Sequence, residues 1–305
     1  MGLTSIHNII YNTCKTIWAV LAAPIYLNKI TESKWKVNAK DFFTLWNFSN
    51  CIGALDGKHI TVQAPPNSGS LFYNYKNSFN IVLLAACDAN YIFTLIDIGA
   101  YGSQSDGGIF KESIFGRAME SNNLNIPPDD YIPATNVKIP YAVVADEAFP
   151  LKKFIMRPYP GRQLTHKKRI FNYRLSRARR VIENAFGILT ARWRILKHNI
   201  NAHPKNVDVM VQAIVVLHNF CKTHSSNAQY CPPGYTDVGD QDNGGWRIDL
   251  NNEPLPSVGR LSANIASRQN YDIRDAMADY FVSLPWQIDC VFRGKKILLT
   301  GLNFE

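Results

Sequence analysis

The feature that most constrains this sequence is a long basic stretch, from Lys152 to Lys205, with almost no acidic residues. Between Ala148 and Val207 there are fifteen lysines and arginines and one acidic residue, Glu183. This window carries a formal charge of +14, and the remainder of the chain sums to −5, because the chain has 33 basic and 24 acidic residues in all. Such localised charge favours a polyanionic partner, and nucleic acid more than a membrane.

The middle of this window has the period of a long amphipathic helix, because apolar residues recur every three or four positions. They are Phe171, Leu175, Ala178, Ile182, Phe186, Leu189 and Trp193. Arg179 and Arg180 precede Glu183 by about one turn. An ion pair on a solvated helix face is the common role for such a glutamate. One carboxylate cannot neutralise so many cations, whereas a phosphate backbone can, so we favour a phosphate-binding surface in which Glu183 holds a divalent cation.

Composition favours one large domain with additions, since 46% hydrophobic content over 305 residues can bury a full core. The six cysteines are scattered without a C-x-x-C pair, which is typical of a reducing compartment. The longest apolar run, Ile17 to Leu27, is interrupted by Pro24 and is too short to span a bilayer. The N-terminus has no cleavable signal pattern, so we expect a soluble intracellular protein with no membrane partner.

The middle of the chain predicts three antiparallel strands, over Cys51–Val62, Phe79–Cys87 and Tyr91–Ile98. A helix is expected near Ile109–Met119. The next segment, Ser121–Pro140, contains four prolines and little periodicity, and predicts a surface excursion.

A short buried fourth strand is predicted over Tyr141–Ala145, and a late helix over Val207–Cys221. Three strands, a helix, a fourth strand and a late helix form the element order of a ribonuclease H-like domain, an α/β fold with a mixed sheet flanked by helices. Asp56 lies in the first strand, Asp146 at the carboxyl end of the fourth, and Glu183 on the long helix. Ligands of open α/β sheets collect at the carboxyl ends of strands, so these acids can converge on two Mg²⁺ ions.

The flanks of this core predict further helices. Residues 5–23 and Leu27–Phe48 have helical character, as does Arg268–Leu284, which could cap the domain or dock a partner. Ser225–Pro256 is rich in Asn, Asp, Gly and Pro, and predicts a mobile segment. The expected organisation is a helical region at 1–48, the core domain at 49–224, and a flexible linker with a helical tail at 225–305.

Six blocks of sequence, in order along the chain, resemble the PIF/Harbinger transposases and the Harbinger-derived nuclease-like proteins of animals. The blocks are Cys51-Ile-Gly-Ala-Leu-Asp-Gly-Lys-His-Ile, Pro65-Pro-Asn-Ser-Gly-Ser, Gly99-Ala-Tyr-Gly-Ser-Gln-Ser-Asp-Gly-Gly, Val144-Ala-Asp-Glu-Ala-Phe-Pro-Leu, Arg157-Pro-Tyr-Pro-Gly and Arg179-Arg-Val-Ile-Glu-Asn-Ala-Phe-Gly-Ile-Leu. The resemblance runs from about Asn47 to Asn219. It implies a DDE-type endonuclease domain on a ribonuclease H-like fold, with Asp56, Asp146 and Glu183 as the DDE carboxylates.

The same family has an acid in the glycine-rich turn after the third strand, matched here by Asp106. Asp106 is therefore a fourth candidate metal ligand, although a helix N-cap would fit Ser-Asp-Gly-Gly equally well. Phosphodiester hydrolysis needs an activated nucleophile and a neutralised leaving oxygen, and two metal ions supply both. Hard oxygen ligands select Mg²⁺ or Mn²⁺.

The resemblance implies a metal-dependent DNA endonuclease that hydrolyses phosphodiester bonds. An alternative of another class is a catalytically silent, domesticated protein that binds DNA or acts as an adaptor. The intact acids favour the enzyme. On the basic helix we expect phosphate contacts rather than base contacts, because the cations surround Glu183. The arginines concerned are Arg174, Arg177, Arg179 and Arg180.

Members of this family usually carry a helix-turn-helix region ahead of the DDE domain. Here residues 2–10 resemble its final helix, and the helices that would support it are not present in the sequence. We therefore expect weak sequence preference, with site choice by a Myb/SANT-like DNA-binding partner. Such a protein is expected in the nucleus, with the cytoplasm as a second location.

Two further patterns are weaker. His218, Cys221 and His224 form H-x2-C-x2-H, which is suggestive of zinc. At helical spacing these residues spread over about 240°, and no fourth ligand is near in the sequence. His59 follows Asp56 by three residues, which places it on the opposite face of the strand. A core or surface histidine is the favoured interpretation there.

Overall fold

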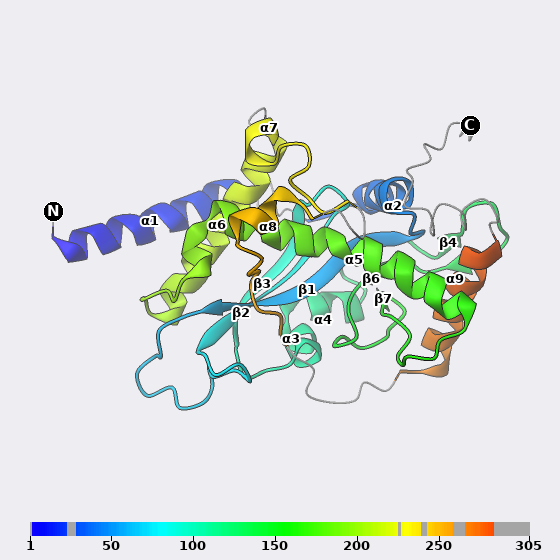
Figure 1. Cartoon of the computed structure of the whole chain (residues 1–305), viewed down its shortest axis with the longest axis horizontal. Coiled ribbons are helices and arrows are strands. Elements are labelled where there is room, and N and C mark those ends of the chain that lie inside the picture. Colours follow the sequence, from blue (N-terminus) through cyan, green and yellow to red (C-terminus); the bar gives the residue numbers. More distant parts are fainter. Residues whose placement is uncertain (1, 23–28, 225–226, 239–242, 259–265, 284–305) are drawn as a thin grey trace.

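A computed structural model describes residues 2–22, 29–224, 227–238, 243–258 and 266–283 (Figure 1). Its centre is a five-stranded sheet in the order β3-β2-β1-β6-β7. The strands are β1 Cys51–Thr61, β2 Asn80–Cys87, β3 Phe93–Tyr101, β6 Ala142–Val144 and β7 Ile155–Met156. The helices are α1 Leu3–Leu21, α2 Glu32–Trp46, α3 Asp106–Glu112, α4 Ile114–Glu120, α5 His166–Arg192, α6 Pro204–Thr223, α7 Asn227–Tyr230, α8 Gly245–Asp249 and α9 Arg268–Ser283, with a 3₁₀ turn η2 at Arg194–Lys197.

The directions of the strands make this a mixed sheet. β1, β2 and β3 form an antiparallel meander, while β1–β6 and β6–β7 are parallel pairs. This confirms the predicted α/β class and is consistent with a ribonuclease H-like fold. β6 runs parallel to the first part of β1 and ends opposite Ala54, so the chain that follows β6 leaves the sheet beside the middle of β1. The predicted aspartates come from these two places.

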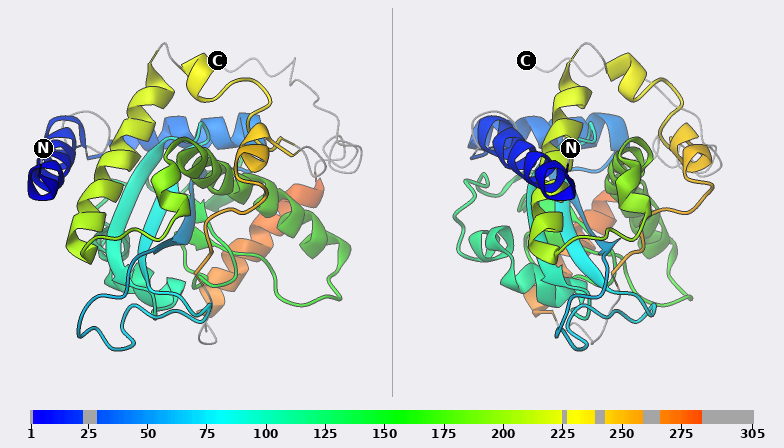
Figure 2. Two further views of the ribbon diagram at one scale, coloured as in Figure 1. Left: turned by 60° about the vertical axis from the view of Figure 1, so that its left-hand side comes forward. Right: turned by 90° about the vertical axis from the view of Figure 1, so that its left-hand side faces the viewer.

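Helices cover both faces of the sheet (Figure 2). All eight residues of β2 are buried, as expected for a strand between two helical layers. Ile81, Leu83 and Ala85 pack into a cluster with α5 and α6. The alternate residues Val82 and Leu84 face a second cluster with α3 and α4.

The longest helix, α5, packs its predicted apolar stripe on the sheet. Six of the seven stripe residues are buried, and Trp193 is half-buried where the helix ends. α9 packs on α5, with the ring of Phe281 against those of Phe48 and Phe171. Of the two roles considered for this tail helix, capping the domain is the one that the structure shows.

Ser225–Pro256 differs from its prediction. The sequence indicated a mobile segment, but α7 in this range packs on α6, and α8 packs on α5. Trp246 is 1% exposed and Leu250 fully buried, and both join Ile188 of α5 in a small apolar cluster. Average composition predicted mobility, whereas a few large apolar side chains are enough to anchor the chain. Residues 225–226 and 239–242 lie outside the described residues. The domain boundaries after residues 48 and 224 stay predictions.

Three local features were not predicted from the sequence. The single helix expected near residues 109–119 is divided into α3 and α4 at Ser113, whose side chain accepts from Gly116 N at 2.9 Å and caps the second helix. The expected surface excursion contains a short hairpin, β4 Asp130–Tyr131 with β5 Lys138–Ile139. The strand β7 has only two residues. Elements this short have no periodicity to recognise.

At the N-terminal end, α1 lies along α6 (Figures 1 and 2). The contact is partial, because Cys14 and Trp18 are half-buried while Ile9 and Val20 are more than half exposed. None of the described helices is both long and apolar enough to cross a membrane.

Candidate active site

Three of the four candidate carboxylates lie near one another, where β6 ends beside the middle of β1. Asp56 is in β1, Asp146 follows the end of β6, and Asp106 begins α3. The charge of Asp106 interacts with those of Asp56 and Asp146. Asp106 Oδ1 also lies directly over Gly57, where a Cβ would be only 2.3 Å from it. Glycine at this position is therefore required for the close approach of α3 to β1.

Asp106 is fully buried, and neither of its carboxyl oxygens has a hydrogen-bond partner among the described residues. Burial, and then the charges of Asp56 and Asp146, raise the pKa of Asp106 to about 9. The N-cap of α3 is Ser105, whose side chain accepts a hydrogen bond from Gly108 N at 3.3 Å. The capping role considered for Asp106 therefore belongs to its neighbour, which leaves the carboxyl of Asp106 for the acidic cluster.

The carboxylates of the other two aspartates have hydrogen-bond or charged partners within the chain. Asp56 is 2% exposed, with Oδ1 accepting from Gly57 N at 2.9 Å and Oδ2 2.9 Å from Lys58 Nζ. Asp146 Oδ1 accepts a hydrogen bond from Ala148 N at 2.9 Å. Burial and the charge of Asp56 raise the pKa of Asp146. The sequence analysis did not identify Lys58 as a site residue. Residues i and i+2 of a strand lie on the same face, so the spacing of Asp56 and Lys58 could have predicted that their side chains are neighbours.

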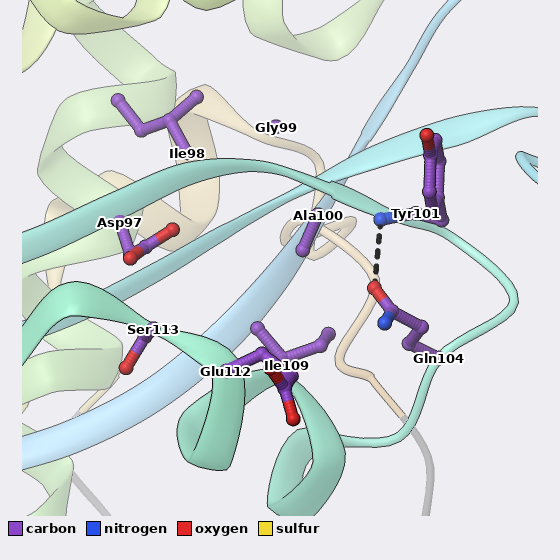
Figure 3. A pocket seen from close by; sticks show the side chains of 9 residues that line it. All are labelled: Asp97, Ile98, Gly99, Ala100, Tyr101, Gln104, Ile109, Glu112 and Ser113. Atoms are coloured by element: carbon purple, nitrogen blue, oxygen red, sulfur yellow. Dashed lines mark hydrogen bonds between the residues drawn. The ribbon is translucent and has the colours of Figure 1, made fainter. Parts of the chain in front are cut away.

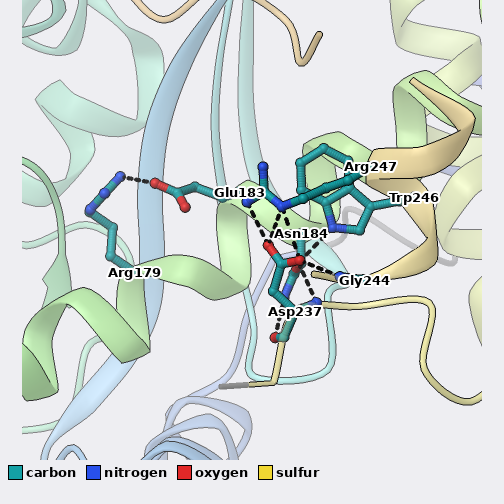
Figure 4. Close-up of polar contacts among 7 residues, drawn as sticks. All are labelled: Arg179, Glu183, Asn184, Asp237, Gly244, Trp246 and Arg247. Carbon is teal, nitrogen blue, oxygen red and sulfur yellow. Dashed lines mark hydrogen bonds and ion pairs between the residues drawn. The ribbon is translucent and has the colours of Figure 1, made fainter. Parts of the chain in front are cut away.

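Glu183 faces a cation. Its Oε1 lies 2.6 Å from Arg179 Nη1, in the i,i+4 ion pair that was the alternative role for this glutamate (Figure 4). Burial lowers the pKa of Arg179, but the charges of Glu183, Asp56 and Asp146 outweigh burial and raise it. The guanidinium of Arg179 is therefore close enough to interact with all three carboxylates of the predicted DDE set.

The described residues contain no group of three or more His, Cys, Asp or Glu side chains placed closely enough to hold a metal ion. The donor set nevertheless suits a hard divalent cation, because Asp106 brings two unpaired, buried carboxyl oxygens beside Asp56 and Asp146. These three aspartates would hold the ion once their side chains moved closer together, and Glu183 would join them after leaving Arg179.

The H-x2-C-x2-H pattern forms no zinc site in the described structure. His218 is fully buried, with Nδ1 2.9 Å from Tyr230 Oη and Nε2 2.9 Å from the Tyr91 carbonyl. His59 is also fully buried, with its ring beside that of Tyr75, and burial lowers the pKa of His59 to about 4. Of the core and surface positions considered for His59, the structure shows the core.

The four arginines predicted to contact DNA do not form one surface. Arg174 is 2% exposed, and its guanidinium lies 4.6 Å from the centre of the Phe281 ring. The prediction is therefore wrong for Arg174, because its side of α5 is covered by α9. Arg179 points to the acids, whereas Arg177 and Arg180 are partly exposed and stay candidates for phosphate contacts.

A separate cleft lies between β3 and α3 (Figure 3). It has a volume of about 320 Å³, and its lining residues include none of the four candidate carboxylates. Asp97 in this cleft accepts from Ile114 N at 2.8 Å, and burial raises the pKa of Asp97. Asp97 thus serves as a reference acid outside the cluster.

A mixed sheet with helices on both faces, and with aspartates where β6 ends beside the middle of β1, is consistent with the ribonuclease H-like class of proteins. Residues 55–219 match the family model described as DDE superfamily endonuclease, and the chain belongs to this family. The matched range contains Asp56, Asp106, Asp146 and Glu183.

Named relatives agree with the Harbinger resemblance found in the sequence. The chain is 28% identical over 175 residues to "Protein ALP1-like" of Arabidopsis thaliana, covering 55% of this chain and 41% of that protein. It is 23% and 22% identical over 195 residues to "Putative nuclease HARBI1" of Rattus norvegicus and Homo sapiens, covering 63% of this chain and 52% of each relative. The chain thus spans about half the length of these curated relatives. No solved structure matches it significantly.

Proposed function

We propose that this chain is a metal-dependent endonuclease that hydrolyses DNA phosphodiester bonds. Asp56, Asp106, Asp146 and Glu183 would hold Mg²⁺ or Mn²⁺. The observation that carries the proposal is the carboxyl of Asp106, which is fully buried and unpaired next to two other aspartates in a DDE superfamily endonuclease. Burial of such a group without a counter-charge is costly, and a bound cation would remove that cost.

When bound, divalent cations supply an activated nucleophile and neutralise the leaving oxygen. The residues of the chain prepare the site for this chemistry. Asp106 must release a proton from its carboxyl before it can act as a ligand, because its pKa is raised to about 9. Arg179 holds Glu183 until the ligand set assembles, and its guanidinium is then able to pair with a substrate phosphate.

DNA would be held mainly through charge. Arg177 and Arg180 on α5 are partly exposed, and Arg162 and Arg169 are exposed in the same basic window. Phosphate contacts of this kind are independent of base sequence. We therefore propose that a Myb/SANT-like partner selects the target site and that the protein acts in the nucleus, as the family resemblance implies.

One observation favours the alternative, a catalytically silent DNA-binding or adaptor protein. Glu183 forms an ion pair with Arg179, and Asp56 forms one with Lys58. Such pairs compensate part of the acidic charge without metal. A protein that used these pairs permanently would keep the fold and bind DNA without cutting it.

Calorimetric titration with Mn²⁺ separates the two functions. The wild type should bind Mn²⁺, and Asp146→Asn should lose binding while it stays folded. Asp97→Asn is the matched control, because Asp97 is also an acid with a pKa raised by burial but lies in the separate cleft. Wild-type protein that binds DNA but no Mn²⁺ would support the adaptor instead.

A further inference from the structure

A segment beyond the matched range lies on the helix that carries Glu183. We call the described residues 235–238 and 243–258 the brace. The brace crosses α5 (Figures 1 and 4). It then pairs with β1, the strand that carries Asp56. No residue of the brace belongs to the range 55–219 that matches the endonuclease family.

The first anchor of the brace is Asn184, the residue after Glu183, which is fully buried. Asn184 Oδ1 accepts from Asp237 N at 3.0 Å and from Trp246 Nε1 at 2.9 Å (Figure 4). Asn184 Nδ2 donates to the Asp237 carbonyl at 3.0 Å. Three of the four hydrogen bonds available to this amide therefore go to the brace, so the brace is tied to α5 at the residue next to Glu183.

The indole of Trp246 forms the second contact with α5. It is 1% exposed and lies over Gly187, where a Cβ would be 2.4 Å from the ring. Gly187 is one turn after Glu183, so a methyl group there would displace the brace next to the candidate ligand. Arg247 Nε and Nη2 hold Asp237 Oδ2 at 3.0 and 2.6 Å, which closes the loop around Trp246.

The other end of the brace is bound to β1. The Pro256 carbonyl accepts from His59 N at 2.8 Å, and Ser257 forms an antiparallel bridge with Lys58. Lys58 Nζ donates to Ser257 Oγ at 2.6 Å and is also the cation paired with Asp56. β6 pairs with β1 only up to Ala54, so the brace covers the edge that β6 leaves open.

We infer that the brace positions Glu183 relative to Asp56, with Asn184, Trp246 and Ser257 as positioning residues. Only nine residues, 247–255, separate the anchor on α5 from the anchor on β1. This short connection ties together the two elements that supply candidate ligands from distant parts of the sequence. The inference rests on the proposed function, because it is the metal ligands that are positioned.

Two substitutions test the α5 anchor without removing a large side chain. Trp246→Phe keeps an aromatic ring but removes the donor to Asn184 Oδ1. Alanine is a better helix former than glycine, so Gly187→Ala should favour α5 itself. Any weakening of the contact between α5 and the brace must then come from the collision of the new methyl group with Trp246. In a Trp246→Ala background the same Gly187→Ala change should have little further effect.

Trp35→Phe is the matched control. Trp35 is 1% exposed and donates its indole N–H to the Leu124 carbonyl at 2.8 Å, but it belongs to α2 and its hydrogen bond goes neither to α5 nor to the brace. Its substitution removes the same kind of ring and hydrogen bond. General loss of packing would therefore affect all three variants alike.

The first measurement is amide hydrogen exchange without metal. Trp246→Phe and Gly187→Ala should both speed exchange of the His59 amide, whose acceptor is Pro256, by about tenfold, the effect of losing one buried hydrogen bond. Trp35→Phe should leave that amide unchanged. Changes confined to α5 and residues 235–247 would overturn the inference, because the two anchors would then be independent.

The second measurement is Mn²⁺ affinity by calorimetry. Both brace variants should bind Mn²⁺ about tenfold more weakly, the lower end of the effect of groups that orient metal ligands, whereas Trp35→Phe should match the wild type. Equal affinity in all four proteins would overturn the positioning role. If the wild type binds no Mn²⁺, the proposed function fails, and hydrogen exchange alone then decides whether the brace ties α5 to β1.

Discussion

Replacing Asp106 with asparagine should stabilise the metal-free protein at neutral pH. Burial, followed by the charges of Asp56 and Asp146, raises the pKa of Asp106 from 3.8 to about 9. Between those values the folded protein binds a proton that the unfolded chain does not, so the free energy of unfolding falls as pH rises. The slope is about 1.4 kcal/mol per pH unit, which gives an upper bound of about 4 kcal/mol lost by pH 7. Asparagine carries no charge and should recover about 2–4 kcal/mol of this.

Thermal unfolding in a chelator, between about pH 5 and pH 8, measures this effect. The unfolding temperature of the wild type should fall across this range, and that of Asp106→Asn should fall less. Added Mn²⁺ should stabilise the wild type, since it binds the folded form, but not Asp106→Asn. Asp208→Asn is the control, because burial raises the pKa of Asp208 to about 6 on α6, away from the cluster. This control should also stabilise the protein, yet keep the response to Mn²⁺.

The reasoning would be refuted if Asp106→Asn and the wild type unfolded at the same temperature throughout this pH range. It would also fail if Mn²⁺ stabilised both proteins equally. The first result would mean that Asp106 is not a buried acid with a raised pKa. The second would place the metal elsewhere.

Three further predictions concern the cations and the choice of site. Arg179→Met should bind Mn²⁺ more tightly by calorimetry, because Glu183 loses its competing partner, while DNA cleavage should slow; weaker binding would contradict this. Arg177→Gln with Arg180→Gln should lower the salt slope of DNA binding by about two, whereas the buried Arg174→Met should reduce stability and leave the slope unchanged. The preference for terminal-repeat over scrambled duplexes should stay well below about a thousandfold at physiological salt, and a value near that level would show that the chain reads sequence unaided.

The sheet and the long helix could be predicted because their signals are local. β2 is buried on both faces and reads as a continuous apolar run, and α5 repeats its apolar residues at helical spacing. The grouping of Asp56 with Asp146 followed from the parallel strands β1 and β6. Once the element order was known, the carboxyl end of β6, which lies beside the middle of β1, indicated the location.

What the sequence could not show depends on contacts between distant segments. Arg174 was predicted to contact DNA because other arginines surround it on α5. Its guanidinium instead lies against Phe281, which is more than a hundred residues further along the chain. Trp246 lies in a polar segment whose composition predicts mobility, and its burial depends on the space above Gly187 and on the hydrogen bond to Asn184. The role of Asp106 depended on whether it or Ser105 capped α3, which is a matter of side-chain geometry.

The most direct test of the account is nicking of supercoiled plasmid DNA in Mn²⁺ by the wild type and Asp146→Asn. The account predicts that the wild type nicks the plasmid in Mn²⁺ and not in chelator. Asp146→Asn should stay folded, keep its affinity for DNA, and fail to nick, because one of the clustered carboxylates is gone. Equal nicking by both proteins, or none by a wild type that binds DNA, would contradict the claim that these acids form a nuclease site.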